Sequence, residues 1–326
     1  MDIGIAKEIA ADGLERRVAL LPEEVKELIK ADHRVFAEKG LGEGIYISDE
    51  DYRMAGAVVS DRLTVMSQPI VVKLKAPLPE EFELLGDNLL FCMLHAEQNP
   101  HYLEALRERN VASITMELVR NEAQERLVEC TQISGEQGML MAFNLAEKSP
   151  AECNVLVLGY GAIASGALKV ANGLGANVKI LRKREYPHMS SFIKNKDIIV
   201  NGIEWPKEKR LQKEYLITKD MLALLNKGAI VLDLSVDYPN PIETCHPTFL
   251  DDPVYTVSGI KHIGLYGYPG KAPLSSASRY SKQILPLVLE IASTSLEDLP
   301  KHLKDAIVTF PKTVKDLQPQ LEIAVL

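Results

Sequence analysis

Cysteine and histidine are scarce in this sequence, and neither is arranged as a metal or disulfide framework. The 326 residues include 4 cysteines and 7 histidines. The cysteines lie far apart without a Cys-x-x-Cys pair, and the histidines include no His-Glu-x-x-His motif. Common zinc sites and disulfide scaffolds need such closely spaced ligands or paired cysteines. We therefore expect reduced cysteines, no metal site and a cytoplasmic location.

Long apolar runs and an excess of positive charge are also missing. No apolar run approaches the roughly 20 residues that a membrane-spanning helix needs. The opening Met1–Arg17 is interrupted by charged side chains and lacks the apolar core of a signal peptide. A formal net charge of -8 argues against a general nucleic-acid binder. We expect small-molecule substrates, and neither nucleic acid nor a membrane as a partner.

Short apolar segments alternate with helical patterns along a chain long enough for two domains. One helix is predicted to open at Pro22, another at a capping-box pattern that starts with Ser134, and a last one runs from Ser275 on, with Pro286 kinking it. Helical patterns also cover 100–109 and 167–174. Strands are predicted at 2–5, 34–37, 70–74, 89–94, 154–158, 177–181, 197–200, 229–234 and 254–257, and those at 70–74, 89–94 and 154–158 are expected to be buried. This alternation predicts an α/β fold with parallel sheets.

A glycine loop follows the predicted strand that ends at Leu158. The six residues Gly159–Ala164 match G-x-G-x-x-A and precede an apolar helix. Gly159 permits a tight turn, Gly161 lets the backbone approach a pyrophosphate at the helix N-terminus, and Ala164 allows close packing of helix and strand. Ala162 and Ile163 open the helix there. This context favours a dinucleotide site over a glycine turn that binds nothing.

The end of the next strand indicates which dinucleotide binds. NAD sites place Asp or Glu there to accept a hydrogen bond from the ribose 2′-OH. This sequence has Arg182, Lys183 and Arg184 instead. Cations at this position can bind a 2′-phosphate. We therefore predict NADP(H) as the cofactor, with a solvated surface turn as the alternative.

Three polar residues follow predicted strands or lie in loops, where α/β sheets gather their ligands. They are Arg17, Lys75 and His95. A keto acid needs a cation for its carboxylate, a donor for its carbonyl oxygen and a group that titrates near neutral pH. The three residues can supply these in turn. Each taken alone is more often a surface charge or a hydrogen-bonded structural histidine.

Several segments in order along the chain resemble the alanine dehydrogenase/transhydrogenase N-terminal family. They are 3–9, 17–20 with Pro22, 72–77, 94–96, 159–164, 232–237 and 268–270 with Pro273. The resemblance implies that Arg17 and Lys75 bind the keto acid and that His95 is the general acid/base. It implies that Asp237 lies near the substrate amine and the nicotinamide ribose. Ser134 and Ser235 are then cofactor contacts, beside Gly159, Gly161, Ala162, Ile163, Arg182, Lys183 and Arg184.

The resemblance also implies two Rossmann-like domains and a homo-oligomer. We expect a discontinuous substrate domain, residues 1–130 plus 280–326. An NADP-binding Rossmann domain, residues 131–279, is inserted into it.

Departures from the family pattern bear on the substrate. Arg182 replaces the acidic residue of alanine dehydrogenases, Ala76 replaces the Glu of their Lys-Glu-Pro, 237–240 replaces their Asp-Gln-Gly-Gly, and Gly267 replaces the Asn before their Met-Pro-Gly. These features are similar to the carboxyethylornithine synthases, a shorter NADP-dependent branch. They imply reductive condensation of pyruvate with the side-chain amine of ornithine, giving an opine-type secondary amine. The alternatives are an alanine dehydrogenase, a saccharopine-dehydrogenase-like enzyme, and, from another class, a non-catalytic NADPH sensor.

Overall fold

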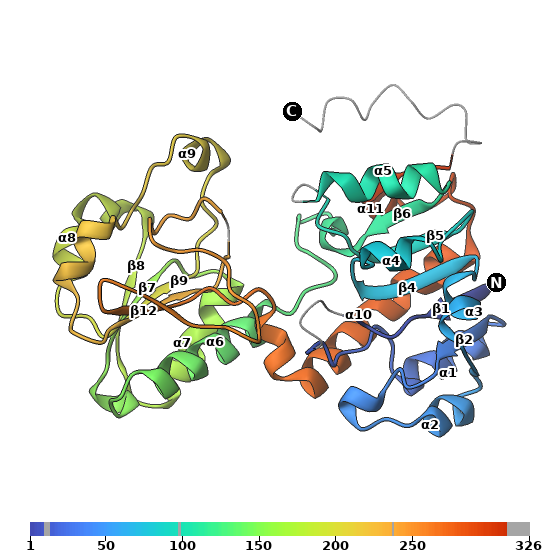
Figure 1. The fold of residues 1–326 in the computed structure, drawn as a ribbon, viewed down its shortest axis with the longest axis horizontal. Helices are drawn as coiled ribbons and strands as arrows, with labels where there is room; N and C mark the ends of the chain where they lie inside the picture. The colour runs from blue at the N-terminus through green and yellow to red at the C-terminus, as the bar shows by residue number, and fades with distance from the viewer. Residues whose placement is uncertain (10–13, 97–98, 237, 312–326) are drawn as a thin grey trace. The chain divides into compact units, whose positions relative to one another are not determined.

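The computed structural model describes residues 1–9, 14–96, 99–236 and 238–311 (Figure 1). The chain forms two compact units. The first combines Met1–Glu129 with the chain from Pro273 on, and the second is Cys130–Ala272. Both are α/β units with mostly parallel sheets, which confirms the predicted fold class. The boundary predicted at residue 280 lies inside helix α10 (Pro273–Ser293), whose first residue begins the return to the first unit.

The first unit is built on a sheet with seven strands among the described residues, in the order β13-β6-β5-β4-β1-β2-β3. β13 pairs antiparallel with β6, and the other pairings are parallel. β1, β2 and β3 follow one another toward one edge of the sheet. The next strand, β4, pairs with the other side of β1, so the strand order reverses between β1 and β4. The bounds are β1 (Asp2–Ile5), β2 (Arg34–Glu38), β3 (Val58–Ser60), β4 (Ile70–Lys75), β5 (Leu89–Met93), β6 (Ala112–Thr115) and β13 (Ile307–Thr309).

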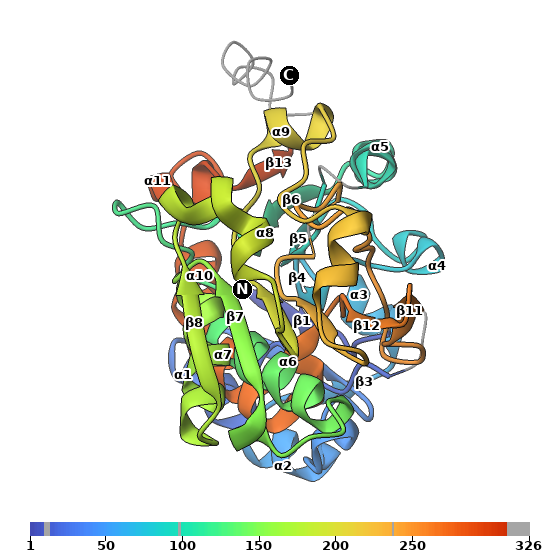
Figure 2. The same ribbon diagram turned by 90° about the vertical axis from the view of Figure 1, so that its left-hand side faces the viewer.

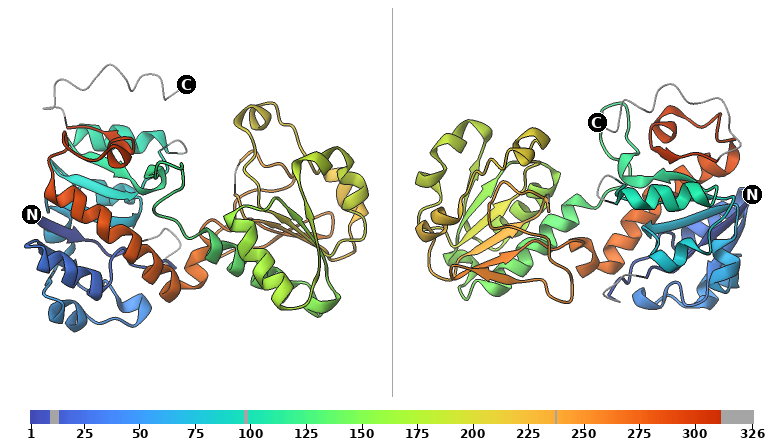
Figure 3. Two further views of the ribbon diagram at one scale, coloured as in Figure 1. Left: turned by 180° about the vertical axis from the view of Figure 1, so that it is seen from behind. Right: turned by 45° about the horizontal axis from the view of Figure 1, so that its top comes forward.

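Helices cover both faces of this sheet. Figure 1 and the reverse view in Figure 3 show α10 on one face and α4 on the other. The Ser281 hydroxyl of α10 donates to Glu24 at 2.6 Å and accepts from the backbone N–H of Leu21 at 2.8 Å, which fixes α10 to the start of α1. The helices are α1 (Pro22–Lys30), α2 (Asp49–Met54), α3 (Arg62–Met66), α4 (Pro79–Phe82), α5 (Pro100–Glu108) and α11 (Lys301–Lys304), with the 3-10 turns η1 (Glu43–Ile45) and η2 (Met116–Leu118).

The second unit holds a sheet in the order β11-β12-β10-β9-β7-β8. β11 pairs antiparallel with β12, and the remaining pairings are parallel. The chain goes from β7 to β8 and returns to β9 on the other side of β7, so the strand order reverses between β7 and β9. The bounds are β7 (Asn154–Leu158), β8 (Asn177–Leu181), β9 (Ile198–Asn201), β10 (Ile230–Asp233), β11 (Tyr255–Val257) and β12 (Ile260–Ile263).

Alternating side chains of β7 bury both faces of this sheet. Val155 and Val157 join the core cluster under α6 and α7, whereas Leu156 and Leu158 join the cluster on the opposite face. α6 and α7 lie side by side (Figures 1 and 2). The helical segments are α6 (Thr131–Leu145), α7 (Ala162–Gly173), α8 (Met189–Phe192), α9 (Lys207–Leu211), η3 (Pro150–Glu152), η4 (Lys183–His188), η5 (Lys219–Leu224) and η6 (Tyr268–Lys271).

The structure corrects one detail of the sequence analysis and adds short elements. The capping box predicted at Ser134 is wrong, because α6 already begins at Thr131. The Ser134 hydroxyl donates back to the carbonyl of Cys130 at 3.1 Å, one turn earlier. The strands β3, β6, β12 and β13, each of three or four residues, were not predicted. Within the described ranges, no helix is both long and apolar enough to span a bilayer.

Candidate active site

The three predicted substrate residues follow neighbouring parallel strands of the first unit. Arg17 lies in the loop after β1, Lys75 is the last residue of β4, and His95 comes two residues after β5. The strand order β5-β4-β1 puts the carboxyl ends of these strands side by side. The strand order reverses between β1 and β4, and in open α/β sheets ligands bind in the crevice at such a point. The structure therefore brings the three residues to one edge of one sheet.

Arg17 is buried and held by Glu15. Its Nε donates to Glu15 Oε1 at 2.7 Å and its Nη2 donates to Oε2 at 2.5 Å. The guanidinium carbon lies 5.7 Å from the centre of the Tyr280 ring of α10. Burial favours a raised pKa for Glu15, but the hydrogen bonds and charge of Arg17, together with the charge of Lys75, lower this pKa to about 2. The guanidinium plane is thus fixed before any substrate binds.

The end of β4 is held by the buried side chain of Glu8. Its two carboxylate oxygens accept the backbone N–H groups of Leu74, at 2.7 Å, and Lys75, at 3.1 Å. Burial raises the pKa of Glu8, against the opposing charge of Lys73. The positive charge of Lys75 lowers the pKa of both Glu15 and His95. Glu8 therefore fixes the backbone from which Lys75 extends.

His95 has a left-handed backbone, with φ of 49°, and it is held by Glu117 of η2. Its backbone N–H donates to Glu117 Oε1 at 2.5 Å, and its Nδ1 lies 3.9 Å from the same oxygen. Burial lowers the pKa of His95; the charge of Glu117 opposes this, and the charges of Lys75 and Arg126 add to it. The imidazole is consequently neutral near pH 7 and can accept a proton.

The glycine loop of the second unit lies at the carboxyl edge of its sheet, between β7 and α7. Gly159 has φ of 87°, a conformation that a residue with a Cβ rarely adopts. A Cβ on Gly161 would meet no heavy atom of the described residues within 4 Å, so space is open there. Ala164 packs against Gly202, where an added Cβ would lie 2.8 Å from the Ala164 Cβ. The backbone geometry suits a phosphate at the N-terminus of α7.

The cations predicted to select NADP(H) lie just beyond β8. Arg182, Lys183 and Arg184 are exposed. Glu185 was not considered in the sequence analysis; its carboxylate accepts the Arg182 backbone N–H at 2.9 Å and lies 3.7 Å from the Lys179 ammonium. That backbone hydrogen bond lowers the pKa of Glu185 more than burial raises it. The carboxylate therefore closes the turn while the three cationic side chains face solvent.

Among the remaining predicted contacts, the structure describes Ser134 and Ser235. Ser134 is buried in the first turn of α6, and the Ser235 hydroxyl donates to the carbonyl of Ile203 at 2.6 Å. Asp237 lies outside the described residues. Sequence reasoning missed Glu8 and Glu117, which hold the backbones of Lys75 and His95. No local pattern marks them, because each acts on a residue more than 20 positions away.

Two family models match the chain. Residues 4–135 match "Alanine dehydrogenase/PNT, N-terminal domain", and residues 182–310 match "Alanine dehydrogenase/PNT, C-terminal domain". The chain belongs to the alanine dehydrogenase/PNT family. Alanine dehydrogenase of Methanococcus maripaludis is 28% identical over 97% of this chain and 92% of its own length. Alanine dehydrogenase of Staphylococcus haemolyticus is 28% identical over 90% of this chain and 87% of its own length.

Solved structures resemble this alanine dehydrogenase/PNT family member over nearly its whole length. An L-alanine dehydrogenase matches with a TM-score of 0.84 and 27% identity, covering 95% of this chain and 96% of that chain. A transhydrogenase from Sinorhizobium meliloti matches in fold, with a TM-score of 0.82 and 21% identity over 95% of this chain and 98% of that chain.

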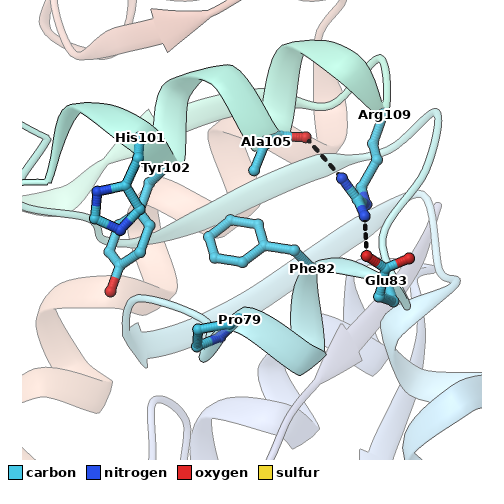
Figure 4. A pocket seen from close by; sticks show the side chains of 7 residues that line it. All are labelled: Pro79, Phe82, Glu83, His101, Tyr102, Ala105 and Arg109. Atoms are coloured by element: carbon cyan, nitrogen blue, oxygen red, sulfur yellow. Dashed lines mark hydrogen bonds and ion pairs between the residues drawn. The ribbon is translucent and has the colours of Figure 1, made fainter.

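A hollow of about 220 Å³ lies between α4 and α5 of the same first unit (Figure 4). Phe82 and Tyr102 form its apolar part, with ring centres 5.2 Å apart, and an ion pair between Arg109 and Glu83 closes one end. None of the predicted site residues that the structure describes lines it. Across the described ranges, no group of three or more His, Cys, Asp or Glu side chains could hold a metal ion.

Proposed function

We propose that this protein is a nicotinamide-nucleotide-dependent oxidoreductase that interconverts an amino acid and its 2-keto acid. The observation that carries the proposal is the position of Arg17, Lys75 and His95 after three adjacent parallel strands. The names of the relatives support an alanine dehydrogenase reaction, in which ammonia is the nitrogen donor. Among the candidate reactions, this one has the most support.

Each of the three residues has a chemical task in this proposal. Arg17 and Lys75 bind the substrate carboxylate and the carbonyl oxygen, since both are cationic donors. His95 exchanges protons with the substrate as amine, water and carbonyl interconvert. Because burial lowers the pKa of His95, the ring is free to act as a base at neutral pH. Glu15 keeps the guanidinium oriented, and Glu117 holds the backbone from which the imidazole extends.

The second unit has the features that a dinucleotide requires. The positive φ of Gly159, the open space at Gly161 and the N-terminus of α7 fit a pyrophosphate. When bound, a nicotinamide nucleotide would supply or accept the hydride. We include a preference for NADP(H), because Arg182, Lys183 and Arg184 are exposed beyond β8.

The cofactor preference is tested with Arg182→Asp. We expect the Kd for NADPH to rise about 10- to 100-fold, from loss of a charge-assisted contact, while the Kd for NADH changes little. Lys227→Asp is the matched control, since Lys227 is exposed and lies just before β10, at the amino-terminal end of that strand. An unchanged ratio of the two affinities in Arg182→Asp would remove the 2′-phosphate argument.

The reductive condensation of pyruvate with ornithine is the second candidate. It is favoured by the departures from the alanine dehydrogenase pattern at Ala76 and Gly267. The replacement of Asp-Gln-Gly-Gly by residues 237–240 also favours it. A screen of NADPH oxidation that crosses pyruvate and 2-oxoglutarate with ammonia, ornithine and lysine separates the candidates. Binding of NADPH without turnover on any amine would contradict both and leave a nucleotide sensor.

The proposal includes a homo-oligomer in the cytoplasm. Light scattering after gel filtration tests the assembly, and a monomer at micromolar concentration would contradict it.

A further inference from the structure

Asp233 ends β10 in the second unit and is buried, with 1% of its surface exposed. Its Oδ1 accepts from the side-chain amide of Asn201 at 2.8 Å and from the backbone N–H of Ser235 at 3.2 Å. Its Oδ2 accepts from the side-chain amide of Asn240 at 2.6 Å. Its carbonyl oxygen accepts from the Tyr268 hydroxyl at 2.6 Å. One residue thus joins the end of β9, the loop after β10 and η6.

The segments joined by Asp233 also contact the glycine loop. The Ser235 hydroxyl donates to the carbonyl of Ile203 at 2.6 Å. A Cβ on Gly159 would lie 2.5 Å from Ile203 Cγ2, and the N–H of Gly202 donates to the carbonyl of Leu158 at 3.1 Å. The loop after β9 therefore contacts both the glycine loop and the Asp233 network.

The direction of a bound dinucleotide follows from the strand order. With the adenosine half over β8 and the pyrophosphate at α7, the nicotinamide half extends across β9 and β10, on the other side of β7. We propose that Asp233 is a positioning residue for this nicotinamide half. It holds Ser235 and the loop after β9 in the binding conformation. The inference rests on the proposed function.

A carboxylate is the side chain that this network requires. The amides of Asn201 and Asn240 and the N–H of Ser235 all donate to Asp233, and an ionised carboxylate only accepts. Asparagine has nearly the same shape, but one of its terminal atoms is an NH₂ donor. In Asp233→Asn, a donor would face a donor, so at least one buried hydrogen bond is lost without a change in volume.

The test measures nucleotide binding by wild type and Asp233→Asn, using fluorescence titration with NADPH and, in parallel, NADH. Adenosine 2′,5′-bisphosphate and AMP are the matched ligands, because they carry only the adenosine half. We expect the Kd for the full dinucleotide to rise about tenfold, with the Kd for the matching half unchanged. The urea midpoint of Trp205 fluorescence checks that the second unit remains folded.

Asn240→Ala is the second variant, which keeps the carboxylate but removes one donor to it and the acceptor of the Ile242 backbone N–H. It should raise the dinucleotide Kd about threefold. Adding Asn240→Asp to Asp233→Asn restores a donor–acceptor pair and should recover affinity. Unchanged dinucleotide affinity in the folded variants, or an equal loss for both ligands, would overturn the inference. A wild type that binds no nucleotide at all would overturn the proposed function, and the inference with it.

Discussion

Replacing Glu15 with Gln removes the partner of a buried cation. The Arg17 and Glu15 side chains are 4% and 5% exposed and are joined by two hydrogen bonds. A carboxyl whose pKa falls from 4.5 to about 2 on folding stabilises the folded state by about 3 kcal/mol above pH 4.5. Leaving Arg17 buried and unpaired carries a penalty of about 3–5 kcal/mol. We therefore expect Glu15→Gln to lower the free energy of unfolding of the first unit by about 3–5 kcal/mol at pH 7.

The pH dependence of this effect has a definite sign. Because folding lowers the pKa of Glu15, its contribution is fully present above pH 4.5 and is lost as the pH falls toward 2. The difference between wild type and Glu15→Gln should therefore shrink below pH 4.5. Urea unfolding followed by far-UV circular dichroism measures it. Trp205, the sole tryptophan, lies in the second unit, so its fluorescence transition should stay unchanged.

Glu122→Gln is the control for this prediction, because Glu122 is exposed in a turn of the first unit. Its effect should remain within about 0.5 kcal/mol. A change of less than about 1 kcal/mol in Glu15→Gln at pH 7 would refute the reasoning, as would a difference that does not narrow in acid.

Three further predictions concern the reaction and the second unit. His95→Gln should lower turnover about 10²- to 10⁴-fold with an unchanged nucleotide Kd. The wild-type rate of amino-acid oxidation should rise with pH through the lowered pKa of His95, and equal rates at all pH values would refute its role as a base. Gly166→Ala should lower the urea midpoint of Trp205 fluorescence, because its Cβ would lie 2.0 Å from a backbone oxygen of α6, whereas Gly173→Ala, with no described atom within 4 Å, should not. Burial lowers the pKa of His262 to about 4, so its contribution to the free energy of unfolding is fully present above pH 6.5. We expect the free energy of unfolding of the second unit to fall by about 2 kcal/mol between pH 7 and pH 5. His262→Gln should flatten this pH dependence in the same Trp205 assay.

Much of the fold could be read from short stretches of sequence. The runs that became β4 and β7 are mostly apolar, because both faces of those strands are buried. A helix start at Pro22 was predicted from the fixed φ of proline and the acidic first turn, and α1 begins there. The positions of Gly159 and Gly161 followed from the same local logic, since a turn between a strand and a helix restricts the backbone within a few residues.

The candidate site was predictable only in its residue types. Arg17, Lys75 and His95 could be named because each follows a predicted strand or lies in a loop. Their proximity depends on the order β5-β4-β1, in which the first strand of the chain pairs with the fourth. Periodicity within a segment reports which residues are buried, and it carries no information about which strands become neighbours.

The sequence by itself predicted the strands other than β3, β6, β12 and β13, together with the glycine loop and the cations beyond β8, because these depend on neighbours along the chain. The tertiary structure alone decided that Glu15 neutralises Arg17 and that Glu117 holds His95. It also decided that Asp233 gathers Asn201 and Asn240. Charges and hydrogen bonds act over a few ångströms in space, and burial strengthens them where water is excluded. The partner of a buried polar group is therefore known only when distant segments have packed together.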